Sequence, residues 1–385
     1  MNREKGQGGV RAALSGLLLG ALGVVLALLL LEGVVRLWFD EGPPILLRDA
    51  VVGDRYRPSY RELVYSASAG RMVHRSFNRL GYRGPDRPEH KPEGVRRVAV
   101  LGDSFTASIA LDDAETMPAI LERVLNTQAG GRWEVLNFGV DAYSPVQSLL
   151  TWRNFARALS PDVVILCFFN GNDVSDDDRR MTNYPRPYYS LGSDGQLVFE
   201  PLPPFFSAST HLLDEYSRLY VWQRTRVQAV INRFRNGATR VPGVARYLDS
   251  QPTQEIEESW VLTERILTLF ADEVHAAGEV FVLVSVPDLV QVRDADWKVA
   301  LGLVDPAMAP HLRRDYPEQR LAAFAKAHGI PFVPLFEPLR LAAAAGKEVY
   351  LPDGHWNEVG TRIGAEVLAT KVPALVAAPE GAAVQ

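Results

Sequence analysis

Cysteine is almost absent from this chain of 385 residues, with Cys167 as the only one. It lies in an apolar run, where we expect it to pack as a small buried side chain, and disulfides within the chain do not stabilise the fold. Basic residues are not in excess either, because 46 Asp and Glu outnumber 41 Lys and Arg, so we expect no nucleic acid partner. The seven histidines do not cluster with other ligating residues at the spacing of a metal site. We therefore predict no metal and no cofactor.

Charge is missing from one stretch near the N-terminus. Residues 12–31 contain no charged side chain, and about 20 apolar residues cross the roughly 30 Å hydrocarbon core of a bilayer as a helix. Basic residues precede this stretch and acidic residues follow it, namely Arg3, Lys5 and Arg11, then Glu32, Asp40 and Glu41. This asymmetry predicts a cytoplasmic N-terminus and an external remainder.

A cleaved signal peptide is the alternative interpretation of the same stretch. The apolar run is long for a signal peptide, and no small-x-small cleavage motif follows it. We therefore predict a single-pass anchor in the inner membrane, in contact with the lipid bilayer through residues 12–31, with the rest of the chain in the periplasm.

Beyond the anchor, the composition divides the chain into four segments. We assign residues 1–40 to the cytoplasmic end and the anchor, 41–96 to a linker and N-terminal extension, 97–375 to one α/β domain, and 376–385 to a flexible tail. Within the domain, apolar strands alternate with amphipathic helices, which predicts a parallel sheet with helices on both faces. Strands are expected at 97–101, 134–138, 162–170, 280–286 and 331–334, and helices near 117–125, 145–159, 212–235, 255–277 and after 357.

The alternation breaks between residues 175 and 253, which are rich in proline and tyrosine. Because this insertion leaves the sheet directly after the third predicted strand, it is placed to cover the mouth of a site at that edge. Its tyrosines and Trp222 are then suited to stack on sugar rings. A cap packed for stability and a docking surface for another envelope protein are equally good interpretations.

A serine follows the first predicted strand, and an acid and a histidine occur far down the chain. The apolar run Val98–Leu101 stops at Gly102 and leads to Ser104, and open α/β sheets place ligands just beyond the carboxyl ends of their strands. A serine hydroxyl needs a base, usually histidine, and the histidine needs a carboxylate that orients it. Asp353 and His355 lie two positions apart in an extended segment, so their side chains point the same way. Alternatively, the segment is an ordinary strand-to-helix turn in which Ser104 caps the following helix.

Two further strand ends carry groups suited to stabilise an oxyanion. Attack on an ester carbonyl places negative charge on its oxygen, which preorganised amide and backbone N–H donors stabilise. Asn172 follows the third predicted strand and is the candidate side-chain donor, whereas the segment 135–145 ends another strand with small residues that offer backbone N–H groups. An Asx turn for Asn172 and a loop capped by Ser144 are the alternatives.

Together the four segments resemble the SGNH hydrolase superfamily, also called the GDSL-like hydrolases, whose members carry Ser, Gly, Asn and His in four blocks in this order. Gly102-Asp103-Ser104 resembles the first block and Asn172-Asp173 the third, with Asn170 in place of the expected glycine. The resemblance spans about residues 75–375 and includes Asn78–Gly84, a stretch that often precedes the nucleophile strand in bacterial members. It implies a flavodoxin-like three-layer α/β/α sandwich with a mainly parallel sheet.

The resemblance also implies an oxyanion hole. Ser104 is the nucleophile and contributes its own N–H, and the amide of Asn172 completes the hole. The second block supplies another N–H, either from Ala142, which aligns best, or from Gly139. An alanine still offers this donor.

The resemblance further implies that His355 is the base. The acid of the family usually precedes the histidine by three residues, where this chain has Pro352. The role of Asp353 therefore rests on a shorter spacing, which some relatives in polysaccharide acetylation share.

The implied activity is ester hydrolysis through an acyl-enzyme. Together with the envelope location, it indicates an acylated small molecule or the O-acyl groups of a glycan as substrate, and envelope polysaccharide machinery as a partner. An O-acyltransferase acting on a polysaccharide and a non-catalytic envelope assembly protein on the same fold are the alternatives.

Overall fold

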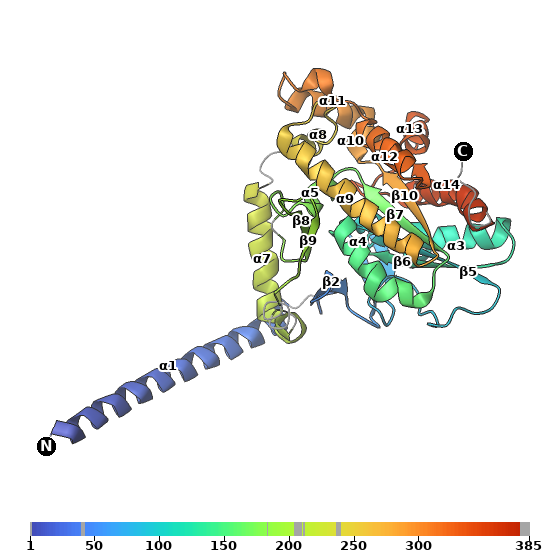
Figure 1. Cartoon of the computed structure of the whole chain (residues 1–385). Coiled ribbons are helices and arrows are strands. Elements are labelled where there is room, and N and C mark those ends of the chain that lie inside the picture. The colour runs from blue at the N-terminus through green and yellow to red at the C-terminus, as the bar shows by residue number, and fades with distance from the viewer. Residues whose placement is uncertain are drawn as a thin grey trace. The chain divides into compact units, whose positions relative to one another are not determined.

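A computed structural model describes residues 2–39, 43–182, 184–203, 210, 212–235 and 240–377 (Figure 1). The predicted tail lies outside the described residues from position 378 onward. The chain divides into two compact units, which we name the anchor unit (1–48 and 205–237) and the α/β unit (49–204 and 238–385).

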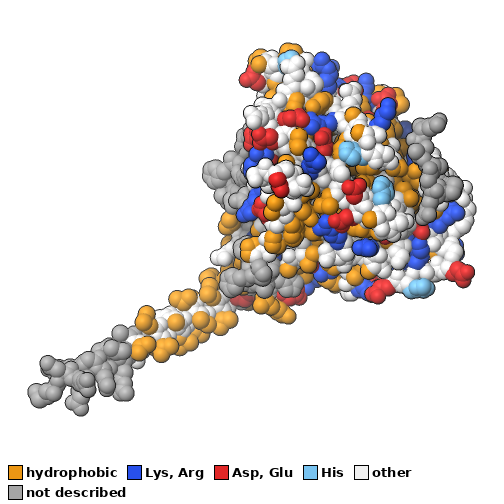
Figure 2. All heavy atoms as spheres, viewed as in Figure 1, with side chains coloured by type: hydrophobic (Ala, Val, Ile, Leu, Met, Phe, Trp, Pro, Cys, Tyr) orange, Lys and Arg blue, Asp and Glu red, His pale blue; other side chains and the backbone are white. Residues whose placement is uncertain are grey.

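The anchor unit contains the long helix α1 (Asn2–Trp38) and α7 (Arg218–Arg235). Within Leu14–Trp38, a window of 18 residues has a mean hydropathy of 2.7 and contains no buried residue, and apolar side chains surround this part of the helix (Figure 2). The helix is long and apolar enough to cross a membrane, which an anchor and a signal sequence have in common.

Glu32, near the end of α1, joins this helix to the start of α7. Its carboxylate accepts hydrogen bonds from the backbone N–H groups of Arg218 (2.8 Å) and Leu219 (2.9 Å) and from the hydroxyl of Ser217 (2.9 Å). The first N–H groups of a helix have no partner within it, so Glu32 caps α7.

Five parallel strands form the central sheet of the α/β unit. They are β5 (Val95–Gly102), β6 (Arg132–Gly139), β7 (Val163–Phe169), β10 (Val280–Val286) and β11 (Phe332–Pro334), in the spatial order β11-β10-β7-β5-β6. Numbered along the chain from β5, this is the flavodoxin-like order 2-1-3-4-5. The predicted parallel sheet is confirmed, and its strand bounds lie within two residues of those expected.

Helices cover both faces of the sheet, which gives three layers. On one face, α3 (Met117–Gln128) contacts β6 and α14 (Glu358–Ala377) contacts β7, in the same apolar cluster as Val98 and Val100 of β5. On the other face, Trp260 of α9 (Gln254–Ala276) contacts Phe168 of β7, with ring centroids 6.1 Å apart. Because side chains alternate across a strand, the continuous apolar runs are buried on both faces, as predicted.

The remaining elements are shorter. The predicted helix 145–159 consists of α4 (Pro145–Thr151), a π-helical turn at Trp152–Ala156 and a 3-10 turn at Arg157–Leu159. The other helices and 3-10 turns are α2 (Ser104–Ala107), η1 (Asp113–Glu115), α5 (Asp173–Asp177), α8 (Arg240–Ala245), α10 (Leu289–Val292), α11 (Asp294–Leu303), η4 (Ala309–His311), α12 (Tyr316–Ala327) and α13 (Phe336–Ala344). The other strands are β1 (Leu46–Asp49), β2 (Gly53–Tyr56), β3 (Arg61–Ser66), β4 (Arg71–Ser76), β8 (Tyr188–Leu191) and β9 (Leu197–Glu200).

Residues 49–96, expected as a linker and extension, belong to the α/β unit and contain the antiparallel hairpin β3–β4. Its second strand is fastened to the 3-10 turn η1. The N–H of Ser76 donates to Asp113 (3.0 Å), and Arg71 forms an ion pair with Glu115. The segment thus folds onto the domain.

The insertion predicted at 175–253 divides between the two units. Residues 205–237 belong to the anchor unit, whereas the hairpin β8–β9 belongs to the α/β unit. Residues 183, 204–209, 211 and 236–239 of this insertion lie outside the described residues.

Candidate active site

The strand order reverses between β5 and β7, which are neighbours in the sheet although β6 separates them in the chain. Such a reversal is where open α/β sheets bind ligands, beyond the carboxyl ends of the strands. Ser104 comes two residues after β5, and Asn172 comes three residues after β7. The topology therefore brings both predicted residues to the same edge.

The turn that presents Ser104 requires a glycine before it. Gly102 has φ +155°, and a Cβ atom there would lie 2.5 Å from Oγ1 of Thr106. Asp103 caps α2 by accepting a hydrogen bond from the N–H of Phe105 (2.9 Å). Ser104 is the first residue of α2, so its N–H is one of the donors that an α-helix leaves without an internal partner.

Ser104, His355 and Asp353 meet in the structure as predicted from their chemistry. Oγ of Ser104 lies 2.8 Å from Nε2 of His355. Nδ1 of His355 lies 3.3 Å from Oδ1 of Asp353, which also accepts the backbone N–H of His355 at 3.0 Å. With the Nδ1 proton directed at Asp353, Nε2 is free to accept the serine proton.

Electrostatics in this group favour an ionised acid beside a basic imidazole. Partial burial would raise the pKa of Asp353, but hydrogen bonds from His355, from Ser68 and from the His355 N–H outweigh it and hold that pKa well below its usual range. Burial alone would lower the pKa of His355. The hydrogen bond and the charge of Asp353, together with the charges of Asp103 and Asp141, outweigh burial and raise that pKa. His355 is therefore a stronger base than a solvated histidine.

Of the three oxyanion candidates besides Ser104, two line the same cavity as the serine. They are Asn172 and Ala142. Nδ2 of Asn172 donates one hydrogen to Asp176 at 3.0 Å, and an amide nitrogen carries two, so one is left for a ligand. Ala142 has φ +62°, a left-handed conformation that a glycine adopts without strain.

Gly139 has a different environment. Its N–H donates to Oδ1 of Asn137 at 2.9 Å, and a Cβ atom at this position would lie 2.4 Å from the backbone nitrogen of Ala107. The glycine is thus explained by the close approach of α2, and its N–H is already engaged. Ala142 is the better placed of the two backbone candidates.

The cavity at Ser104 has a volume of about 430 Å³. Besides the strand ends, its walls come from residues 65–68 and Arg75 of the β3–β4 hairpin and from the loop 108–111. Among the described residues of the insertion 175–253, none lines this cavity. The hairpin therefore takes the place that the sequence analysis gave to the insertion.

Ser68 is a site residue that the sequence analysis missed. Its hydroxyl donates to Oδ2 of Asp353 at 2.5 Å, across a separation of 285 positions in the chain. A serine in a short hairpin turn carries no motif, so the sequence offers no signal for this contact.

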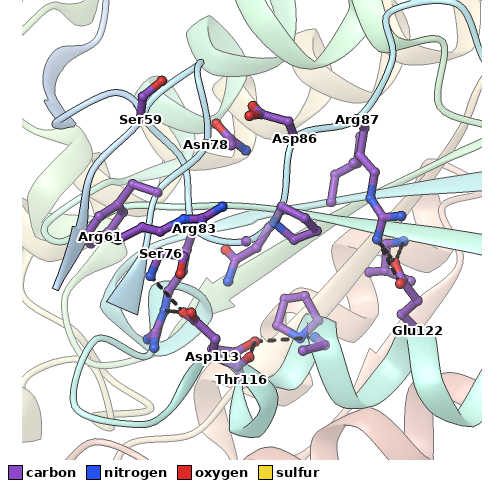
Figure 3. Close-up of a pocket in the computed structure, with 18 residues that line it drawn as sticks. Ser59, Arg61, Ser76, Asn78, Arg83, Asp86, Arg87, Asp113, Thr116 and Glu122 are labelled. Atoms are coloured by element: carbon purple, nitrogen blue, oxygen red, sulfur yellow. Dashed lines mark hydrogen bonds and ion pairs between the residues drawn. The ribbon is translucent and has the colours of Figure 1, made fainter. Parts of the chain in front are cut away.

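A second cavity, of about 470 Å³, lies between the hairpin and α3 and does not include Ser104 or His355 among its lining residues (Figure 3). Four of its charged groups form two ion pairs, Arg87 with Glu122 (2.6 Å) and Arg83 with Asp113 (3.1 Å). Buried Arg83 also donates to the carbonyls of Ala107, Ser108 and Leu111, and so fixes the loop of the first cavity.

No protein-family model matches the sequence, and no curated protein matches it. Solved structures similar to this chain include an acetyl xylan esterase, AlAXEase, with a TM-score of 0.40 and 10% identity over 72% of this chain and 99% of that one. A lipase/acylhydrolase from Enterococcus faecalis matches with a TM-score of 0.37 and 12% identity over 72% and 96% of the two chains. A member of the lipolytic G-D-S-L family from Veillonella parvula matches with a TM-score of 0.38 and 14% identity over 72% and 97%.

Proposed function

We propose that this protein is a serine ester hydrolase that works through an acyl-enzyme. The observation that carries the proposal is the 2.8 Å contact between Oγ of Ser104 and Nε2 of His355, with Nδ1 of the same ring on Asp353. A hydroxyl, an imidazole and a carboxylate in this relation form an activated nucleophile. We infer from it the SGNH-type chemistry that the sequence motifs indicate.

In the first half-reaction, Ser104 attacks the ester carbonyl carbon while its proton passes to Nε2 of His355. The carbonyl oxygen becomes an oxyanion beside the Ser104 N–H, the Asn172 amide and the Ala142 N–H. His355 then gives the proton to the leaving alcohol as the C–O bond breaks. In the second half-reaction, a water molecule loses a proton to His355 and attacks the acyl-enzyme, which releases the carboxylic acid and restores the serine.

Hydrolysis requires that water has access to the base, and the exposure of the site meets this requirement. The side chains of His355 and Asp353 are 34% and 37% exposed. An O-acyltransferase uses the same first half-reaction and must keep water from the acyl-enzyme while the acceptor binds. It remains the second candidate, and a comparison of product release with and without a glycan acceptor separates the two.

For the substrate, we propose the O-acyl groups of an envelope glycan. The cavity is open at Tyr65, a 61% exposed ring on the hairpin, which is suited to pack on the face of a sugar. Its aromatic floor includes Phe105 and Trp356, with ring centroids 5.4 Å apart.

We also propose that α1 is an uncleaved anchor that holds the protein in the inner membrane with the α/β unit in the periplasm. The support is the cap that Glu32 provides for α7. Arg36, one turn further on, pairs with Glu32 at 2.7 Å and donates to the carbonyl of Tyr216 at 2.8 Å. Removal of α1 as a signal peptide would take these partners from a helix of the mature protein.

The test of the activity uses the full-length protein and an aryl acetate. We expect acetate release by the wild type and a loss of at least about 1,000-fold in the S104A variant, with an unchanged circular dichroism spectrum. A fluorophosphonate probe should label Ser104 in the wild type, as read by mass spectrometry, and label nothing at this position in H355A. Equal rates for the wild type and S104A would exclude the proposal and favour the non-catalytic assembly protein.

A further inference from the structure

The catalytic carboxylate is held at both of its oxygens by different parts of the chain. Oδ1 of Asp353 contacts the ring and the N–H of His355, whereas Oδ2 accepts the hydroxyl of Ser68. We propose that Ser68 is a positioning residue for the acid, which makes the β3–β4 hairpin a working part of the active site. This inference rests on the proposed hydrolase function.

The hairpin tip is rigid enough to place a hydroxyl. Strands β3 and β4 pair from Arg61↔Ser76 to Ser66↔Arg71, which leaves residues 67–70 as the turn. Within the turn, the N–H of Gly70 donates to the carbonyl of Ser66 (2.8 Å) and the N–H of Ala69 donates to the Ser66 hydroxyl (3.3 Å). Ser68 therefore has a fixed place in the turn.

Strand β4 is also held along its length. Besides the bonds of Arg71 and Ser76 to η1, the N–H of His74 donates to Asp112 at 3.1 Å. Residues of β4 thus contact three acidic side chains of one short segment, Asp112, Asp113 and Glu115. These contacts fix the hairpin against the loop that lines the same cavity.

The hairpin adds a contact to those that Asp353 makes within its own segment. Asp353 lies in a turn closed by the bond from the Gly354 N–H to the carbonyl of Leu351 (3.0 Å), and its side chain is 37% exposed. The two contacts with His355 both involve Oδ1 and leave the plane of the carboxylate less well defined than its position. A second hydrogen bond, on Oδ2, fixes the plane of the carboxylate and directs Oδ1 at the imidazole.

The role predicts a kinetic signature that a merely structural contact does not have. In this role Ser68 acts on His355 through Asp353, so its loss should lower kcat and leave KM nearly unchanged for an aryl ester too small to depend on the cavity wall at residues 65–68. Without Ser68 the Asp353–His355 bond weakens, and this bond is what raises the pKa of His355. The acid limb of the pH profile should then shift to lower pH.

The experiment measures kcat, KM and the pH profile of the full-length protein with an aryl acetate, for the wild type and the variants S68A, S68T, D353N and S68A/D353N. S76A is the matched control, because Ser76 lies on the same hairpin but lines the other cavity. We expect S68A to lower kcat about tenfold, S68T to restore most of it, and S76A to match the wild type. In the D353N background, S68A should change kcat less than twofold, because the two residues act as one unit.

The outcomes separate this inference from the proposed function. If S104A loses activity but S68A keeps the kcat and pH profile of the wild type, the role of Ser68 is wrong and the hydrolase stands. If S68A lowers kcat by the same factor in both backgrounds, Ser68 acts on the fold and not through Asp353, which also overturns the inference. If S104A keeps full activity, the hydrolase proposal itself fails.

Discussion

At the scale of single residues, the charge balance around His355 determines when the site is active. A general base must be neutral to accept a proton. Because the pKa of His355 is raised above its ordinary value of about 6.5 mainly by the contact with Asp353, kcat/KM should increase with pH through a pKa above that value and then reach a plateau.

The D353N variant tests this balance. The asparagine keeps the shape of the acid but loses its charge, so we expect the plateau of kcat/KM to fall at least about 100-fold. The raising effect of Asp353 is lost too, so the acid limb should shift to lower pH. A pH series of kcat/KM on wild type and variant measures both effects, and an acid limb that moves to higher pH would contradict the assignment of the acid.

Some residues of the site can be predicted from the sequence motifs, and others cannot. Ser104 and His355 were predictable as partners because a serine nucleophile needs a base and Asp353 lies two positions from His355. The choice between Ala142 and Gly139 needed coordinates, because it depends on which N–H is already bonded, and no spacing in the sequence reveals that Gly139 donates to Asn137.

At the scale of elements, the buried arginine of the segment Asn78–Gly84 connects the hairpin to η1 and to the loop 108–111. The Arg83 side chain is 1% exposed and forms an ion pair with Asp113. It also donates to the carbonyl of His74 in β4 and to that of Leu111 in the loop of the catalytic cavity. Removing the Arg83 side chain would leave several buried carbonyl oxygens without a hydrogen-bond donor. Water does not reach these positions and so cannot replace the lost hydrogen bonds.

The R83A variant should therefore lose about 3 kcal/mol of unfolding free energy, as measured by urea denaturation of the full-length protein in detergent. R79A is the matched control in the same segment. The Arg79 side chain is 42% exposed and pairs with Asp86 and Glu89 at the surface, so its removal should cost less than about 1 kcal/mol. Equal losses for the two variants would show that burial of Arg83 adds nothing to the fold.

Elements with continuous apolar runs were predictable, whereas the hairpin was not. The strands of the sheet read as unbroken aliphatic and aromatic sequences, such as 163–169, because both of their faces are buried. The hairpin strands Arg61–Ser66 and Arg71–Ser76 are short, half exposed and rich in arginine, so they resemble a polar linker. What orders them is ion pairing with η1, which is a tertiary contact and leaves no periodicity in the sequence.

At the scale of the whole molecule, the first helix belongs to the folded protein through Glu32. A signal sequence is removed and needs no partner in the mature chain, whereas an anchor remains next to the segments that pack on it. The contacts of Glu32 with Ser217, Arg218 and Leu219 support the anchor that we propose.

The E32A variant tests this at the level of the intact chain. Loss of the cap should cost about 1 kcal/mol locally and expose α7 to protease, so limited proteolysis should cut between residues 212 and 235 faster than in the wild type. Hydrolysis of the aryl acetate should stay within twofold. An N-terminal epitope tag on the wild type should remain on the chain and sediment with membranes, and release of the tag would instead identify a cleaved signal peptide.

The position of the β3–β4 hairpin in the chain has a practical consequence for any fragment of this protein. A fragment that begins at the first strand of the sheet keeps the serine, the asparagine, the aspartate and the histidine, and by motif it is complete. It lacks Ser68 and the wall that residues 65–68 form. Trimming the chain to these blocks would thus remove the proposed positioning residue and also Arg83, so we expect a competent fragment to begin upstream of the hairpin.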